Sequence, residues 1–167
     1  MNEIHGMYVL CGLLVAIVFS GENGGNVNPS TKVGQIGKKT SDETVTVATL
    51  KRILEAFNRH DLDAIMEFFS DDCSFDFPKG PEPWGQRFVG KDLVRKALAG
   101  RLEGIPDVHY GDDRHWVSAD KDMGLSVWTL TGTTTSGLKL EVRGCDLWEF
   151  RSGKVVRKDS YWKIVER

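Results

Sequence analysis

One strand-like segment carries a single charge on its apolar face. In residues 143–150 (RGCDLWEF), a two-residue period places Gly144, Asp146, Trp148 and Phe150 on the same side. A carboxylate is costly to bury unpaired, so such a group is neutralised, paired or used in chemistry. In a dry aromatic pocket a carboxyl group has a raised pKa, which makes it a stronger base and, when protonated, a donor to a developing enolate. Asp146 is therefore the first candidate for acid–base catalysis.

Lys158 is a candidate partner of Asp146. In the segment KVVRKDSYW, Lys158 shares a parity with Val156, Ser160 and Trp162, so a cation also falls on a largely apolar face. A lysine within reach of a buried carboxylate forms a structural ion pair, whereas an unpaired acid stays available for chemistry. The substitution Asp146→Asn distinguishes these two interpretations. If Asp146 is a structural anchor, the protein loses about 1–3 kcal/mol of stability. If Asp146 is a functional acid, the protein loses none.

The segment around His115 has an ambiguous register. His109, Asp113 and His115 share one parity and Tyr110 has the other, so a β-bulge would change which set faces inward. His115 is the second catalytic candidate, as a proton-transfer partner of Asp146. Two histidines six residues apart, without a metal-binding motif, are only a weak indication of zinc. We therefore expect neither a metal nor a cofactor.

Aromatic and polar side chains accompany these groups on the predicted inward faces. Flat rings form walls that suit a ring-containing ligand. The candidate substrate-binding residues are Trp84, Phe77, Tyr110, Trp128, Trp148, Lys158, Ser160 and Trp162. The expected partner is a small hydrophobic or aromatic molecule.

The elements that position these residues change type along the chain. Helical spacing begins at Thr40, where Thr40 and Glu43 fit a capping box, and a second helix follows the predicted cap Asp61. A short strand over 73–77 ends at Pro78, and a loop rich in proline and glycine leads to a third helix that ends at Gly104. Four long strands separated by short turns follow. This order predicts an α+β fold, with helices on one face of a curved antiparallel sheet.

Charge and cysteine content restrict the partners. The chain has a net charge of −2 and no long basic run, so we expect no nucleic acid partner. Its three cysteines are an odd number without paired spacing, which argues against a zinc ribbon or a disulfide framework.

The first forty residues differ from the rest. Residues 1–20 contain an apolar run that is suited to a signal peptide but lacks a basic flank, so cytoplasmic and exported locations stay equally open. Residues 21–40 are rich in glycine and asparagine and are predicted to be a flexible linker. We expect the folded domain to span 41–167 without help from residues 1–40, and membrane contact only if the first segment is an uncleaved anchor.

Three segments carry a resemblance to a known superfamily. The stretches LEAFNRHDLDAIMEFFSDDCSFDFPKG and GCDLWEFRSGKVVRKDSYW, with the Gly-Lys that starts the third helix, resemble nuclear transport factor 2-like and ketosteroid isomerase-like proteins. They are most similar to the SnoaL-like (polyketide cyclase-like) branch, over about 44–167. The resemblance implies a cone-shaped α+β barrel, with three N-terminal helices packed on a curved, mostly antiparallel sheet, and a homodimer through the outer sheet face.

The functional residues of the superfamily transfer only in part. Asp146 falls where ketosteroid isomerase keeps a protonated aspartate, and close to the general base of polyketide cyclases. The isomerase's other aspartate and its tyrosine correspond to Phe77 and Ile53, so the resemblance does not imply steroid isomerisation. The charged residues of limonene epoxide hydrolase are replaced by Ser126, Trp128 and Ser160.

Two functions therefore compete. The first is an enzyme that abstracts an acidic carbon-bound proton from a hydrophobic carbonyl compound, in isomerase, cyclase or lyase chemistry, with Asp146 as the acid–base residue. The second is a non-catalytic ligand-binding or accessory protein that uses the same aromatic cone. Ligand binding without exchange of substrate protons favours the second.

Overall fold

Three helices contribute to the fold. A computed structural model describes residues 44–166, in which α1 spans Val47–Asn58, α2 Leu62–Glu67 and α3 Lys91–Gly104. Thr46 caps α1, because its hydroxyl accepts from the Thr49 N–H while the Thr49 hydroxyl accepts from the Thr46 N–H. A helix that runs on from Thr40 without a break is not found, because residues 44–46 are not helical and α1 begins at Val47.

The second helix begins where the sequence predicts. The Asp61 side chain accepts a hydrogen bond from the Ala64 N–H at 3.0 Å, which confirms Asp61 as the cap. No helix within 44–166 is long and apolar enough to cross a membrane. The predicted capping box at Thr40 and Glu43, the apolar segment 1–20 and the linker 21–40 lie outside the described residues.

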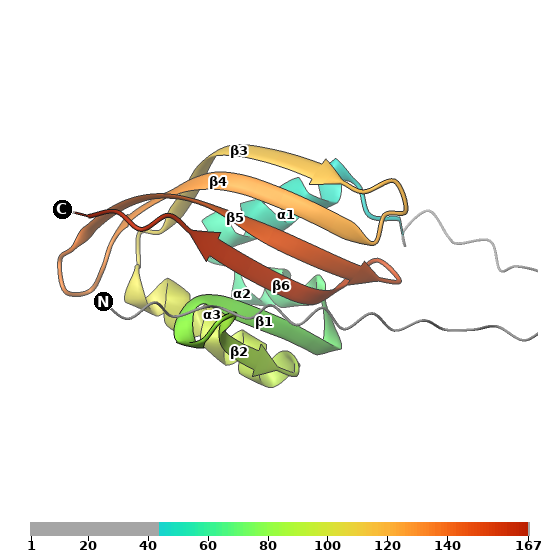
Figure 1. Ribbon diagram of the computed structural model, residues 1–167, viewed down its shortest axis with the longest axis horizontal. Helices are drawn as coiled ribbons and strands as arrows, with labels where there is room; N and C mark the ends of the chain where they lie inside the picture. The colour runs from blue at the N-terminus through green and yellow to red at the C-terminus, as the bar shows by residue number, and fades with distance from the viewer. Residues whose placement is uncertain (1–43, 167) are drawn as a thin grey trace, which may run out of the picture. The chain divides into compact units, whose positions relative to one another are not determined.

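Six strands within the described part of the chain form one sheet. They are β1 (Phe69–Glu82), β2 (Gly85–Val89), β3 (His109–Val117), β4 (Met123–Thr133), β5 (Lys139–Arg151) and β6 (Lys154–Trp162). Their order is β2-β1-β6-β5-β4-β3, and only the β1–β6 pair is parallel. The sheet is curved and the helices pack against one of its faces (Figure 1). The α+β architecture with a mostly antiparallel sheet is thus confirmed.

The segment after residue 77 differs from the prediction. The short strand predicted over 73–77 is part of the longer β1, and the predicted loop is a hairpin that pairs β1 with β2. Pro78 lies at an irregularity in this pairing, between Phe77 and Glu82. Because proline has no N–H for a regular ladder, strands tolerate it at such bulges and edges.

Alternation along β4 and β5 builds the core as expected. Trp128 and Leu130 of β4 and Trp148 and Phe150 of β5 are buried, on the same face as Asp146. The helices close this core with Leu50, Ile53 and Leu54 of α1 and with Val94 and Leu98 of α3. The predicted inward face of β5 is confirmed.

Two β-bulges change which side chains face inward along β3 and β6. In β3, the register shifts between Gly111 and Arg114, so that Tyr110 is buried and the His115 side chain is also fully enclosed. In β6, the pairing with β5 shifts at Phe150, which buries Val155 instead of Val156. The predicted inward orientation of Val156 is therefore wrong.

Substitution of alanine for either of two glycines is expected to change the stability of the protein in opposite directions. A Cβ at Gly144 would lie 2.4 Å from a ring carbon of Trp128 and 2.5 Å from the Tyr161 carbonyl oxygen. Gly144→Ala should therefore lower the free energy of unfolding by about 1–3 kcal/mol through overpacking. Gly100→Ala in α3 meets nothing within 4 Å and should raise it by roughly 0.5–1 kcal/mol. Urea denaturation of both variants checks this, and equal effects would contradict it.

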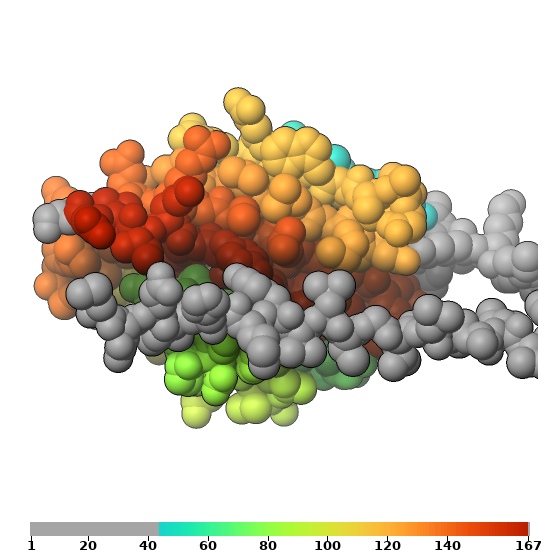
Figure 2. All heavy atoms as spheres, viewed as in Figure 1, coloured from blue at the N-terminus to red at the C-terminus, as the bar shows by residue number. Residues whose placement is uncertain are grey.

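The outer face of the sheet carries apolar rows. Strands β3–β6 form much of the surface seen in Figure 2. The cross-strand register aligns Trp116, Leu125 and Leu147 in one row and Val127, Cys145 and Tyr161 in the next. Trp116 is 50% exposed and Tyr161 is 52% exposed.

The homodimer expected through this face stays a prediction. The sequence places Val127, Thr129, Thr131 and Leu147 there, and such an apolar surface favours association. Light scattering at micromolar concentration should give a dimer mass that Leu147→Glu reduces to that of a monomer. A monomeric wild-type protein would contradict the prediction.

Candidate functional site

Adjacent strands bring four side chains of the predicted site together. The register pairs Asp146 of β5 with Ser160 of β6, and Trp148 with Lys158. Asp146 is 3% exposed and accepts three hydrogen bonds. Oδ1 accepts from Lys158 Nζ and, at 2.6 Å, from Ser160 Oγ, while Oδ2 accepts from Trp128 Nε1 at 3.0 Å. Asp146 is thus a paired carboxylate, one of the two arrangements that the sequence left open.

Lys158 is buried beside this carboxylate. Its Nζ also donates to Ser160 Oγ at 2.5 Å and lies 4.9 Å from the ring centroid of Phe75 and 5.1 Å from that of Trp148. Burial lowers the pKa of Lys158, and the charge and hydrogen bond of Asp146 act in the opposite direction. Each charge therefore depends on the other for its place in the core.

His115 belongs to a separate network. Its Nδ1 lies 2.9 Å from Ser126 Oγ, and its Nε2 lies 2.8 Å from Asp113 Oδ2. Trp148 Nε1 donates to the same Ser126 hydroxyl at 3.0 Å. The network is satisfied when Ser126 donates to Nδ1 and the Nε2–H donates to Asp113. The structure therefore joins His115 to Ser126 and does not bring it into contact with Asp146.

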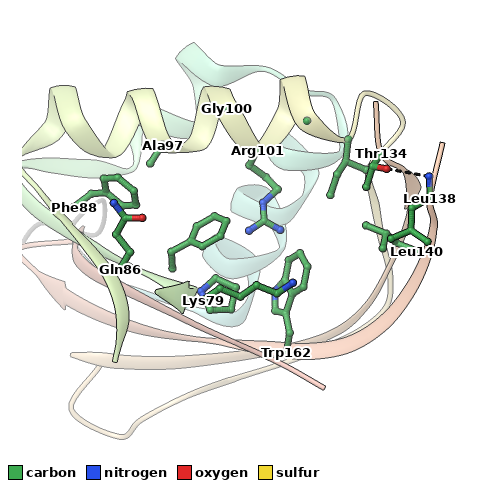
Figure 3. A pocket seen from close by; sticks show the side chains of 14 residues that line it. Lys79, Gln86, Phe88, Ala97, Gly100, Arg101, Thr134, Leu138, Leu140 and Trp162 are labelled. Atoms are coloured by element: carbon green, nitrogen blue, oxygen red, sulfur yellow. Dashed lines mark hydrogen bonds between the residues drawn. The ribbon is translucent and has the colours of Figure 1, made fainter. Parts of the chain in front are cut away.

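Two cavities lie inside the cone. The outer one has a volume of about 460 Å³ and is lined largely by apolar side chains, among them Phe77, Phe88, Leu140 and Trp162 (Figure 3). The inner one, beside Asp146, has a volume of only about 10 Å³. Arg101 and Trp162 line both, so these two side chains separate the outer cavity from the Asp146–Lys158 pair.

The predicted binding residues are distributed unevenly over these cavities. Phe77 and Trp162 line the outer cavity. Tyr110, Trp128, Lys158, Ser160 and Trp162 line the inner one with Asp146.

Two predicted wall residues lie elsewhere. Trp148 is 1% exposed and packs below Lys158, so it lines neither cavity. Trp84 is 50% exposed in the turn between β1 and β2, where the Arg87 guanidinium lies 5.8 Å from its ring centroid. Trp84, predicted to be a pocket wall, lines neither of the two cavities.

Sequence reasoning missed two cations of the outer cavity, Arg101 and Lys79. In Figure 3, Arg101 points from α3 into the cavity toward Trp162. Arg101 follows the apolar residues Ala97 and Leu98 by one helical turn, so the sequence places a cation on the inward face of α3. That spacing was the available signal for Arg101, whereas Lys79 lies in a segment that the sequence predicts to be a loop.

A second buried carboxylate lies outside the cavities. Asp76 is fully buried and accepts from Arg87 at 2.6 and 2.7 Å and from Arg157 at 3.0 and 2.8 Å. Asp76 is buried on the otherwise polar side of β1 because β2 and β6 flank this strand and each supplies an arginine. This cluster is structural, since Asp76 lines neither cavity.

The elements that build this site match a known domain family. The family model described as the SnoaL-like domain matches residues 50–158. The chain belongs to the SnoaL-like domain family. No curated protein is similar to this chain in sequence.

Solved structures show the nuclear transport factor 2-like fold of this SnoaL-like protein. A candidate polyketide cyclase from Pseudomonas putida KT2440 is 18% identical, with a TM-score of 0.64 over 71% of this chain and 91% of that one. A candidate isomerase from Bacillus subtilis is 20% identical, with a TM-score of 0.61 over 75% and 89%. TerC, co-crystallised with polyporic acid, is 17% identical, with a TM-score of 0.59 over 70% and 90%. At these identities the likeness shows the fold alone.

Proposed function

We propose that this protein is a small-molecule enzyme of the SnoaL-like type that removes a carbon-bound proton from a hydrophobic carbonyl compound. One observation carries the proposal: the buried Asp146–Lys158 pair lies behind Arg101 and Trp162, at the inner end of an aromatic cavity. Among the structural relatives are a candidate cyclase, a candidate isomerase and a protein crystallised with polyporic acid, which supports a ring-containing ligand.

The pair offers both halves of an enolisation. Although it is paired with Lys158, Asp146 is the proposed base, and it takes the proton from the carbon beside the carbonyl group. An ammonium group has three N–H donors, and Asp146 and Ser160 use two of those on Lys158. The third stabilises the enolate oxygen as charge develops on it.

Access to Asp146 requires a side chain to move. The inner space of about 10 Å³ is too small for a reacting group. Arg101 is the side chain suited to move, because no hydrogen bond or ion pair among the described residues fixes its Nη1. The ring of the ligand lies meanwhile against Phe77 and Trp162 in the outer cavity.

Deuterium exchange tests the reaction. In deuterated water, the wild-type protein should accelerate exchange at the acidic carbon of 2-tetralone, measured by NMR. Asp146→Asn should reduce this rate about 10²- to 10⁴-fold through loss of the base. Ser160→Ala is the matched control, because it removes a donor to Asp146 and leaves both charges in place. No acceleration by the folded wild-type protein for any bound ketone would refute the proposal.

A ligand-binding protein without catalysis is the second candidate. It is favoured by the three donors that already occupy Asp146 and by the small space beside it. Titration calorimetry that detects binding of 2-tetralone, together with no exchange above the buffer rate, would support this candidate.

A further inference from the structure

Arg101 lies at the boundary of the two cavities and has no ion-pair partner among residues 44–166. It lies in the last turn of α3, and its Cζ is 4.5 Å from the ring centroid of Phe77 and 4.2 Å from that of Trp162. Two aromatic rings thus hold the guanidinium group, as cation–π contacts do, and leave its N–H edge unengaged. An arginine has five N–H donors and stays protonated in proteins.

The Nη1 atom of Arg101 lacks a hydrogen-bond partner. Within residues 44–166, it is the one buried side-chain nitrogen or oxygen in this condition. No carboxylate of this described range lies within ion-pair distance of Arg101, and Asp146 is already paired with Lys158. A buried donor without an acceptor is costly and rare in folded proteins, so it indicates a partner that arrives from outside.

The outer cavity is positively charged. Its charged lining side chains are Lys79 and Arg101, and its lining contains neither aspartate nor glutamate. The remaining walls are mostly apolar, with the rings of Phe77, Phe88 and Trp162 among them. A neutral carbonyl oxygen would accept a hydrogen bond from Arg101 without balancing its charge, whereas an anionic oxygen would do both through a stronger, charge-assisted hydrogen bond.

We propose that the outer cavity binds a ring-containing carboxylic acid, with its carboxylate on Arg101 Nη1 and its ring against the aromatic walls. This inference rests on the proposed function, since it names the substrate class for the same cavity: a hydrophobic keto acid whose carboxylate is close to the reactive carbon. Pairing with the ligand holds the guanidinium group toward the outer cavity, and this opens the path to Asp146.

Two probes of nearly equal shape test the charge requirement. Titration calorimetry compares 2-naphthoate with 2-acetylnaphthalene, which replaces one carboxylate oxygen by a methyl group. The wild-type protein should bind the carboxylate roughly ten- to a hundredfold more tightly, as charge-assisted hydrogen bonds do. Arg101→Met should abolish this preference, and Arg101→Lys should retain part of it. Lys79→Met is the matched control, because it removes the other cation of the cavity and should reduce the preference less.

The outcomes separate this inference from the proposed reaction. Equal affinity for the two probes, or a preference that survives in a folded Arg101→Met variant, would overturn the inference even if ketone exchange is observed. A preference that depends on Arg101, with no deuterium exchange, would support the inference and refute the reaction. Failure of the wild-type protein to bind either probe below about 1 mM would overturn it as well.

Discussion

Asp146→Asn is expected to lower the free energy of unfolding by about 3–5 kcal/mol, because it leaves a buried ammonium group without its counter-charge. The Lys158 side chain is 6% exposed and that of Asp146 is 4% exposed, so water cannot replace the lost partner. From the sequence, Asp146→Asn was expected to leave the stability unchanged if Asp146 is a functional acid. That expectation holds only if the carboxylate is unpaired. With Lys158 in contact, loss of stability no longer distinguishes a functional Asp146 from a structural one, and the exchange rate of folded protein must decide.

A double variant supplies the control. Lys158→Met alone should also destabilise the protein, because it leaves Asp146 as a buried charge. The combination of Asp146→Asn with Lys158→Met should lose clearly less than the sum of the two single effects, since it removes both charges. Urea denaturation of the four proteins measures this coupling. Additive effects would show that the pair contributes nothing.

The pH dependence of Asp146→Asn follows from Lys158. Burial lowers the pKa of Lys158 in the folded protein, and removal of Asp146 takes away the group that raises it. The unfolded chain then binds more protons than the folded one at alkaline pH, so stability rises with pH. The difference in free energy of unfolding between the wild-type protein and Asp146→Asn should therefore become smaller between about pH 7 and about pH 10. A constant difference would contradict this explanation.

Asp76→Asn should lower the free energy of unfolding by about 2–4 kcal/mol, since it breaks the buried carboxylate's bonds to two arginines. The effect falls below that at Asp146 because the side chains of Arg87 and Arg157 are 43% and 31% exposed and stay partly hydrated. Asp63→Asn is the control. Asp63 pairs with Arg95 at an exposed site, where its loss should change little.

The environment of Asp76 also predicts that the stability of the protein falls in acid. Burial by itself raises the pKa of Asp76, but the hydrogen bonds and charges of Arg87 and Arg157 outweigh it and hold the pKa below its usual value. The stability that Asp76 provides is therefore present above the unfolded pKa and is lost as the pH falls through the folded one. Burial raises the pKa of Asp159, so the contribution of this group to stability changes with pH in the opposite direction.

Urea denaturation at about pH 6 and about pH 3 tests the acid dependence. The difference between wild-type and Asp76→Asn proteins should be smaller at the lower pH, because the wild-type carboxyl group is then partly protonated. A difference that is equal at both pH values would exclude Asp76 as a source of acid sensitivity.

The sequence by itself determined the order of the elements, except for β2, and the inward face of β5. Helical spacing and two-residue alternation are local properties, and burial of one face enforces them. Alternation alone therefore places Asp146 on the inward face of its strand, with Trp128 on the neighbouring one. The family resemblance rests on the same local segments.

Only the tertiary structure decided which charges meet. The bulge in β6 sets the register that brings Lys158 to Asp146, and the β1–β2 hairpin brings Arg87 to Asp76. Within residues 44–166 Arg101 has no ion-pair partner, because α3 places it between two rings and Asp146, which lines the same inner cavity, is already paired with Lys158. Bulges and cross-strand pairing depend on contacts between residues far apart in the chain, which periodicity does not encode. The charge of the cavity, from which we infer the class of ligand, therefore became visible only in the folded chain.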